Sequence, residues 1–125
     1  MATFYIASAF DNRHKVAAII KLLREMGHSI THDWTVQEVA YTHHAAKHAQ
    51  EDMDGVVACT DFVALFDEPL HPLNTYVELG MALGLGKRIY VIGNFDNDCI
   101  FSKLPGIQRF NALVDFLQVA NGRLK

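Results

Sequence analysis

The stretch that decides the fold lies at the centre of the chain and reads TDFVALF at residues 60–66 and HPLNTYVELGMALGLGK at residues 71–87. Phe62–Phe66 is a short apolar run with turn residues after it, which is typical of a central parallel strand covered on both faces. Proline lacks the backbone donor that such a strand needs, so the strand ends before Pro69. A helix is predicted from Asn74 or Thr75 to Gly84, because polar residues cap helix starts and glycine ends them.

The segments around this stretch alternate between strand and helix patterns. Strands are predicted at residues 3–7, 28–32, 88–92 and 107–110, and helices at residues 13–26, 36–58 and from a cap at Asn111 to residue 121. The helix over residues 36–58 is expected to break or kink near Gly55. Alternating strands and helices favour a parallel sheet. We therefore expect an α/β, flavodoxin-like (Rossmann-like) three-layer sandwich with five strands in an order near 2-1-3-4-5, formed by residues 1–125 as a single domain.

Two further expectations concern the N-terminal cap of the first helix and the buried side of the last helix. Asp11 or Asn12 is expected to cap the first helix, as short polar side chains do. Val114, Leu117 and Ala120 are expected to line the buried side of the last helix.

The composition and the net charge of the chain limit the classes of protein to which it can belong. Half of the residues are hydrophobic, a fifth are charged and the net charge is −3, which favours a globular chain and gives no broad attraction to a nucleic acid polymer or an anionic membrane. Cys59 and Cys99 lie far apart without metal-type spacing and are expected to be reduced thiols of a cytoplasmic protein. No signal peptide, lipidation motif or membrane-length apolar run is present.

A family resemblance rests on the central stretch. DFVAL at residues 61–65, VELGMAL at residues 77–83 and GKR at residues 86–88 resemble the signature of the nucleoside 2-deoxyribosyltransferase superfamily, which includes the 2'-deoxynucleoside 5'-phosphate N-hydrolases. The resemblance spans roughly residues 3 to 118. It implies that Glu78 is the nucleophile that attacks the anomeric carbon of a deoxyribose. It also implies that Asp52, or else Asp54, binds the substrate and supports its protonation, because DMDG at residues 52–55 resembles a family D-x-x-G segment.

The chemistry of an N-glycosidic bond suits these carboxyl groups. A carboxylate beside the anomeric carbon can form a covalent glycosyl-enzyme intermediate, and a second acid can protonate the departing base. Glu78 fits the first role and Asp52 the second, whether a second base or water then attacks the intermediate. No metal and no organic cofactor is needed.

Helix capping offers another interpretation of Glu78. Thr75 and Glu78 form an S/T-x-x-E capping box, in which the glutamate would bond back to the Thr75 backbone. Another alternative concerns His44, His48 and Asp52, which share a helix face and could bind zinc, although spacing alone does not make a zinc site. His43 and His44 are expected on a solvated face.

Several residues at predicted strand ends are candidates for contact with the substrate. In the family, the aromatic residue at the place of Tyr5 lies near the sugar and the catalytic carboxylate, so Tyr5 joins the catalytic candidates, with a buried core residue as the alternative. The substrate-binding candidates are Ser8, Phe10, Trp34, Asn74 and Met81. Ser8 could instead be only a turn residue. Trp34 could stack on a base, roof the pocket or plug a loop.

The chain also departs from the family pattern. Six residues before Glu78, deoxyribosyltransferases carry a substrate-binding aspartate and the monophosphate hydrolases a phosphate-binding serine, but this chain has Pro72. His71 or Asn74 could compensate. The loop after the first strand lacks the full phosphate-binding pattern of the hydrolases, although Ser8, Asn12 and Arg13 could still contact a phosphate.

The predicted function is cleavage or transfer at the N-glycosidic bond of a 2'-deoxynucleoside or its monophosphate, a small-molecule partner, through Glu78. The alternatives are an N-hydrolase that acts on other nucleotides and a non-catalytic nucleotide-binding module on the same fold. The resemblance further implies a homo-oligomer with shared active sites. The loop at residues 94–105 would complete the site of a neighbouring subunit, with Asn94, Asp98 and Ser102 as candidates, or else be a surface connection.

Overall fold

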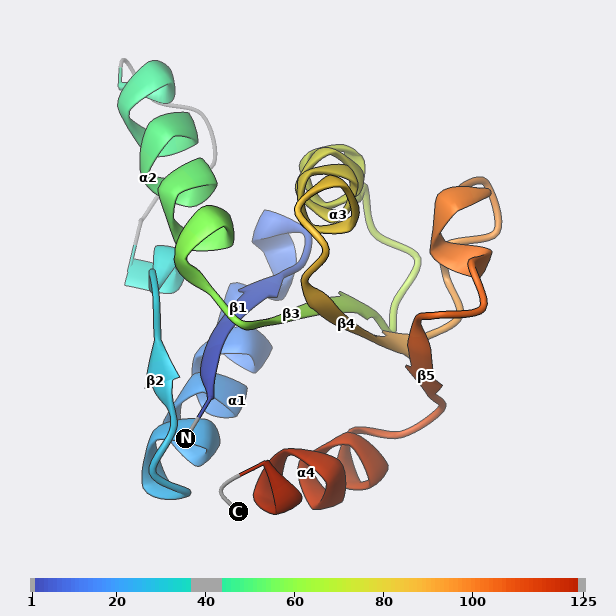
Figure 1. The fold of residues 1–125 in the computed structure, drawn as a ribbon. Coiled ribbons are helices and arrows are strands. Elements are labelled where there is room, and N and C mark those ends of the chain that lie inside the picture. Colours follow the sequence, from blue (N-terminus) through green and yellow to red (C-terminus); the bar gives the residue numbers. More distant parts are fainter. Residues whose placement is uncertain (1, 37–43, 124–125) are drawn as a thin grey trace.

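The computed structural model describes residues 2–36 and 44–123, and its five strands form one parallel sheet in the order β2-β1-β3-β4-β5 (Figure 1). The strands are β1 (Thr3–Ala7), β2 (Ser29–Ile30), β3 (Asp61–Phe66), β4 (Arg88–Gly93) and β5 (Gln108–Phe110). The helices are α1 (Arg13–Glu25), α2 (Ala45–Ala58), α3 (Leu73–Gly84) and α4 (Leu113–Gly122). Single 3₁₀ turns form η1 (Phe10–Asn12), η2 (Trp34–Val36) and η3 (Phe101–Lys103). The predicted fold class and strand order are confirmed.

Helices cover both faces of the sheet, α1 and α4 on one side and α2 and α3 on the other (Figure 1). This explains why the apolar run of β3 is continuous, since all six of its residues are buried between two layers. β1 and β4 flank β3 in parallel register, with Tyr5 opposite Phe62 and Val63 opposite Tyr90. β3 is therefore paired on both sides, and the segments that leave the carboxyl edge of the sheet begin next to one another.

The expected cap position of α1 is confirmed, since Asn12 is its N-cap residue, but Asn12 makes no side-chain cap bond, and the expected cap of α4 is wrong. The side-chain N–H groups of Asn12 donate to the Ser8 hydroxyl and to the Asp67 carboxylate, both at 3.0 Å. α4 has Ala112 at its N-cap rather than Asn111. The expected buried side of α4 is confirmed at Ala120, which is buried, and at Leu117, which packs against the core, but it is wrong at Val114, which is exposed; Phe116 is buried as well.

Helix α2 runs through Gly55 to Ala58 without the expected break. The helix begins at Ala45, while Val36 belongs to η2, and the part of the predicted helix at residues 37–43 lies outside the described residues. Gly55 has a packing reason instead. A Cβ atom there would lie 2.8 Å from Cδ2 of Tyr5 and 2.9 Å from Cβ of His32, so a larger residue would separate α2 from the sheet.

The lengths and compositions of the helices decide whether any of them could cross a membrane. Within residues 2–36 and 44–123, no helix is both long and apolar enough to cross a bilayer.

Candidate active site

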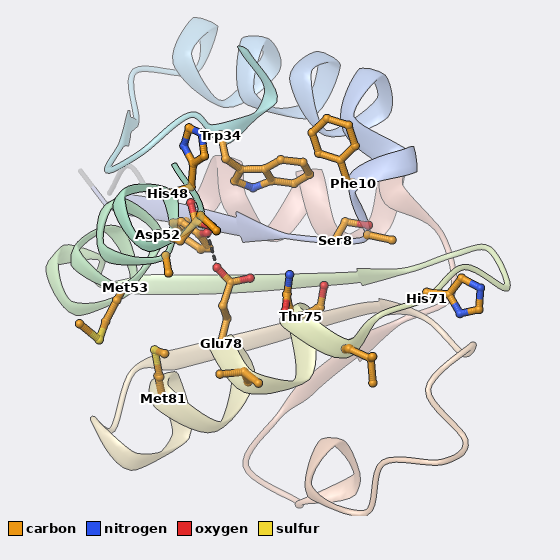
Figure 2. Close-up of a pocket in the computed structure, with 17 residues that line it drawn as sticks. Ser8, Phe10, Trp34, His48, Asp52, Met53, His71, Thr75, Glu78 and Met81 are labelled. Carbon is orange, nitrogen blue, oxygen red and sulfur yellow. Dashed lines mark hydrogen bonds between the residues drawn. The ribbon is translucent and has the colours of Figure 1, made fainter. Parts of the chain in front are cut away.

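A cavity of about 440 Å³ opens at the carboxyl edge of the sheet, between the segments that follow β1, β2 and β3 and the facing sides of α2 and α3 (Figure 2). Open parallel sheets bind ligands at this edge. The structure brings three catalytic and five substrate-binding candidates from the sequence to this one cavity: Tyr5, Asp52 and Glu78, and Ser8, Phe10, Trp34, Asn74 and Met81. Their roles remain predictions.

Glu78 projects from α3 toward the cavity and is 8% exposed (Figure 2). The carboxylate oxygen Oε2 accepts a hydrogen bond from the Tyr5 hydroxyl (dashed in Figure 2). Burial raises the pKa of Glu78 to about 8, and the Tyr5 hydrogen bond opposes that rise. The carboxyl group is therefore poised to gain or lose a proton near neutral pH.

The capping-box interpretation of Glu78 is wrong in this structure. Helix α3 begins at Leu73, with Pro72 at its N-cap, so Thr75 lies inside the first turn rather than at the cap. The Glu78 carboxylate binds Tyr5 and makes no cap bond. This leaves the Thr75 hydroxyl buried against the cavity with no hydrogen-bond partner in the described part of the chain.

Tyr5 serves both the core and the cavity. Its ring is fully buried and stacks on Phe62 with centroids 6.0 Å apart, while its hydroxyl lies at the cavity on Glu78. Burial, together with the neighbouring Glu78 carboxylate, raises the pKa of Tyr5, so the hydroxyl stays protonated as a donor. The two alternatives drawn from the sequence for Tyr5 are therefore compatible.

Asp52 reaches the cavity from α2, while Asp54 does not. The exposed Asp54 carboxylate accepts a hydrogen bond from Gln50 at 2.8 Å. Oδ1 of Asp52 lies 3.3 Å from Nε2 of His32, which follows β2. Burial raises the pKa of Asp52, and the nearby His32 and His48 act in the opposite direction.

Aromatic and thioether side chains form the apolar walls. Trp34 is buried, and its indole N–H donates to the Ile6 carbonyl at 2.6 Å, so it both closes the loop after β2 and roofs the cavity. Figure 2 shows Trp34 and Phe10 across the cavity from Glu78 and Met81. The arrangement places aromatic and thioether side chains beside a carboxylate, which suits a ring system attached to a polar group.

Polar groups of the loop after β1 are largely bonded within the protein. The Ser8 hydroxyl donates to the Leu65 carbonyl and accepts from Asn12, both at 3.0 Å. The Arg13 guanidinium lies over the Phe10 ring, 4.6 Å from its centroid, and does not line the cavity. Pro72, which stands where the family pattern has a substrate-binding residue, does not line the cavity. Its neighbours His71 and Asn74, which could compensate for it, do.

The structure adds His32, His48 and Thr75 to the neighbourhood of the site. The sequence marked His48 only as a metal candidate, and no group of three metal-binding side chains forms among the described residues. His32 stands at the carboxyl end of β2, the position that singled out Trp34, so the same rule could have included it. The sequence did not mark Thr75 as a site residue, because its spacing from Glu78 indicated a helix cap.

The candidates in the loop after β4 lie away from this cavity. The Ser102 hydroxyl donates to the Asp96 carboxylate, and Asp98 accepts a hydrogen bond from the Tyr76 hydroxyl. None of Asn94, Asp98 and Ser102 is among the residues that line the cavity.

Comparisons with known proteins connect this geometry to solved structures. No protein-family model and no curated protein matches the chain. A 2-deoxyribosyltransferase from Bacillus psychrosaccharolyticus is similar in structure, with a TM-score of 0.72 and 17% identity over 93% of this chain and 90% of that one. A CMP N-glycosidase from Clostridium botulinum has a TM-score of 0.64 and 19% identity over 97% and 98% of the two chains.

A conserved protein from Enterococcus faecalis V583 is also similar, with a TM-score of 0.74 and 17% identity over 98% of this chain and 99% of that one. At these identities the likeness concerns the fold. The chain therefore has the fold of solved structures that include a 2-deoxyribosyltransferase and a CMP N-glycosidase, as the resemblance in its sequence implied.

Proposed function

We propose that the protein cleaves or transfers at the N-glycosidic bond of a 2'-deoxynucleoside or its monophosphate, through a covalent glycosyl-enzyme on Glu78. The observation that carries the proposal is the buried Glu78 carboxylate, held by the Tyr5 hydroxyl in a cavity that Asp52 also lines. The fold shared with a 2-deoxyribosyltransferase and a CMP N-glycosidase supports the same reaction class.

In the proposed first step, a carboxylate oxygen of Glu78 bonds to the anomeric carbon while the bond from that carbon to the base nitrogen breaks. The electron pair of the broken bond goes to the base, and a proton from Asp52 neutralises it. Burial leaves the Glu78 carboxylate poorly solvated, so it gains most where positive charge develops on the sugar. In the second step, a new base or water attacks the same carbon and releases Glu78.

The lining of the cavity favours a nucleoside over its monophosphate. No lysine or arginine is among the residues that line it, and residues 37–43, whose sequence is QEVAYTH, contain neither residue. The Ser8 hydroxyl and the Asn12 amide, which could have met a phosphate, are bonded within the protein. A dianionic phosphate would therefore find no guanidinium or ammonium group among the described residues that line the cavity.

The test is chromatography of products from deoxynucleosides, their monophosphates and ribose analogues, each with and without a second free base. Wild type should release or exchange the base, more efficiently with nucleosides than with monophosphates. Glu78→Gln and Glu78→Ala should do neither. A second base incorporated only by wild type would identify transfer, and free base with free sugar would identify hydrolysis. Equal inertness of wild type and both variants on the whole panel would contradict the proposal.

A non-catalytic nucleotide-binding module is the second candidate. Its support is Pro72, which offers no polar side chain at a position where the family places a substrate-binding group. Binding of a nucleoside or nucleotide without turnover, equal in wild type and Glu78→Gln, would favour this candidate. The homo-oligomer with shared sites and the cytoplasmic location are proposed on the family resemblance alone.

A further inference from the structure

The Thr75 hydroxyl is a buried polar group to which the described part of the chain gives no partner. Thr75 is 1% exposed, and its Oγ1 atom makes no hydrogen bond with any described residue. Native proteins pair nearly all of their buried polar side-chain atoms, because water no longer hydrates these atoms. A buried hydroxyl without a partner in the free protein points to a partner that is supplied by a ligand.

Thr75 belongs to the same wall of the cavity as Glu78. Both residues line the cavity, and both lie on the side of α3 that faces it (Figure 2). They stand at positions i and i+3 of α3, where side chains are neighbours with Cβ atoms about 5–6 Å apart. A ligand that is bound at Glu78 therefore has Thr75 beside it.

The hydroxyl can turn toward a ligand without a change in the backbone. Its oxygen is covered in this structure, but threonine in a helix uses two side-chain rotamers. Rotation about one torsion carries the hydroxyl to a different position on the same wall. Because no hydrogen bond to a described residue is broken in that rotation, the new position is reached at little cost.

The other walls of the cavity suit the base, which leaves the α3 wall to the sugar. Trp34 and Phe10 lie across the cavity from Glu78 (Figure 2), and aromatic side chains of this kind stack on a base. In the proposed reaction, Asp52 of α2 protonates the base, while Glu78 bonds to the anomeric carbon of the sugar. Thr75, one helical turn from Glu78, therefore faces the sugar.

The chemistry of Thr75 matches that of an alcohol. A threonine hydroxyl donates one hydrogen bond and accepts others, as the hydroxyl groups of a sugar do. It carries no charge, and no lysine or arginine is among the described residues that line the cavity. A neutral hydroxyl is therefore a better partner for Thr75 than a charged phosphate.

We propose that Thr75 binds a hydroxyl group of the sugar and so makes that hydroxyl a requirement for efficient cleavage. This inference rests on the proposed function, and it narrows the substrate class to nucleosides in which that hydroxyl is free. A 2'-deoxynucleoside offers its 3'-hydroxyl and its 5'-hydroxyl, and the experiment below separates the two. Neither the capping-box spacing nor the fold assigns this role to Thr75.

The test combines a change in the protein with a change in the substrate. Thr75→Val replaces the hydroxyl by a methyl group and keeps the β-branched shape. The substrates are the 2'-deoxynucleoside that wild type cleaves fastest, its 3'-deoxy analogue and its 5'-deoxy analogue. For the parent substrate, kcat/KM should fall on the order of 10-fold in Thr75→Val, the scale of one neutral hydrogen bond. For the analogue that lacks the bound hydroxyl the two proteins should be equal, and for the other analogue the difference should remain.

Two features of the design isolate the hydroxyl. Wild type and variant are compared on the same substrate, so the intrinsic lability of each analogue cancels. The preference among the three substrates is measured within one protein sample, so it does not depend on the fraction of molecules that are folded. Thr75→Ser, which keeps a hydroxyl, is the matched control and should keep the wild-type preference.

Stability is a second readout. Since Oγ1 of Thr75 has no partner among the described residues, Thr75→Val should unfold at the same urea concentration as wild type or at a higher one. Thr31→Val is the comparison, because it removes a hydroxyl that donates to the Gly55 carbonyl at 2.7 Å, and it should unfold at a lower concentration. A clear loss of stability in Thr75→Val would show that the hydroxyl already has a partner in the free protein, which would overturn the inference.

Two kinetic outcomes would also overturn the inference while the proposed function stands. One is an unchanged kcat/KM of Thr75→Val for the parent substrate, and the other is an equal loss on all three substrates. If wild type cleaves no 2'-deoxynucleoside and none of the corresponding 5'-monophosphates, the proposed function itself fails and the inference falls with it.

Discussion

Glu78 is a carboxyl group in a place where the charged form is disfavoured, and this has a consequence for stability. Its pKa is about 8 in the folded protein against an ordinary value of 4.5, so the folded state binds the extra proton between these values. Stability from this group is fully present below pH 4.5 and is lost as the pH rises to about 8. A pKa that differs by one between the folded and unfolded states corresponds to about 1.4 kcal/mol of unfolding free energy.

Glu78→Gln should therefore change the pH dependence of unfolding. Relative to wild type, the variant should gain a few kcal/mol in unfolding free energy between about pH 5 and pH 9, because glutamine has no charge to bury. Urea denaturation at a series of pH values measures this. Parallel curves for the two proteins across that range would show that Glu78 does not change its protonation there.

The Tyr5 hydroxyl is the one hydrogen-bond donor that the described residues give to Glu78, and it favours the charged form of that carboxyl. Tyr5→Phe should raise the pH at which Glu78 ionises by about one to two pH units, since a hydrogen bond to a charged group contributes roughly 1.5–3 kcal/mol. In the proposed reaction, the pH at which kcat/KM rises should move upward by the same amount. Tyr76→Phe, whose hydroxyl binds Asp98 outside the cavity, is the control. An unchanged midpoint in Tyr5→Phe would contradict this prediction.

At the scale of elements, α2 and β1 are in contact because position 55 is a glycine. Gly55→Ala should destabilise the protein by about 1–3 kcal/mol, as overpacking does, because the new methyl group meets the Tyr5 ring and the His32 Cβ. Gly80→Ala in α3 is the matched control, since nothing lies within 4 Å of a Cβ there. That change should stabilise the protein by up to about 1 kcal/mol through helix propensity. Equal effects of the two substitutions in thermal or urea unfolding would contradict the packing argument.

Most elements could be predicted from the sequence because the signals for them are local. β3 has a short continuous apolar run followed by turn residues, which is typical of a strand covered on both faces. Tyr5, Trp34 and Glu78 could be placed together because parallel strands bring their carboxyl ends to one edge.

The errors come from tertiary partners that a local pattern does not contain. Asn12 stands at the N-cap of α1 as predicted, but its side chain binds Ser8 and Asp67 instead of capping the helix, and Asp67 lies far along the chain. Thr75 and Glu78 have the spacing of a capping box, but Tyr5 binds the glutamate. The His32–Asp52 contact depends on a turn after β2 that no periodicity describes.

At the scale of the whole molecule, two fully buried aspartates tie the sheet to its last elements. Asp61, at the amino end of β3, accepts hydrogen bonds from Arg123 after α4 and from the Tyr90 hydroxyl. Asp96, in the loop after β4, accepts a bidentate pair from Arg109 of β5 at 3.1 and 2.7 Å. These bonds hold α4 and β5 against the rest of the sheet.

Burial alone would raise the pKa of Asp96, but hydrogen bonds from Arg109, Ser102 and Lys103 lower it to about 2. Stability from this group is therefore present above about pH 3.8 and lost as the pH falls to about 2. Asp96→Asn should cost about 2 kcal/mol at neutral pH, and its difference from wild type should shrink below pH 3.8. Acid titration of unfolding free energy measures this, and a constant difference down to pH 2 would contradict it.

The hydrogen bond from the Trp34 indole to the Ile6 carbonyl gives the protein an internal optical reporter. Trp34 is the only tryptophan, and its ring is both held in one orientation and part of the cavity wall. Its fluorescence therefore comes from a single, nearly immobile emitter next to the place where a base would stack. A free purine or pyrimidine that enters the cavity should quench this emission, so occupancy can be followed by light, without a label and before any bond is broken.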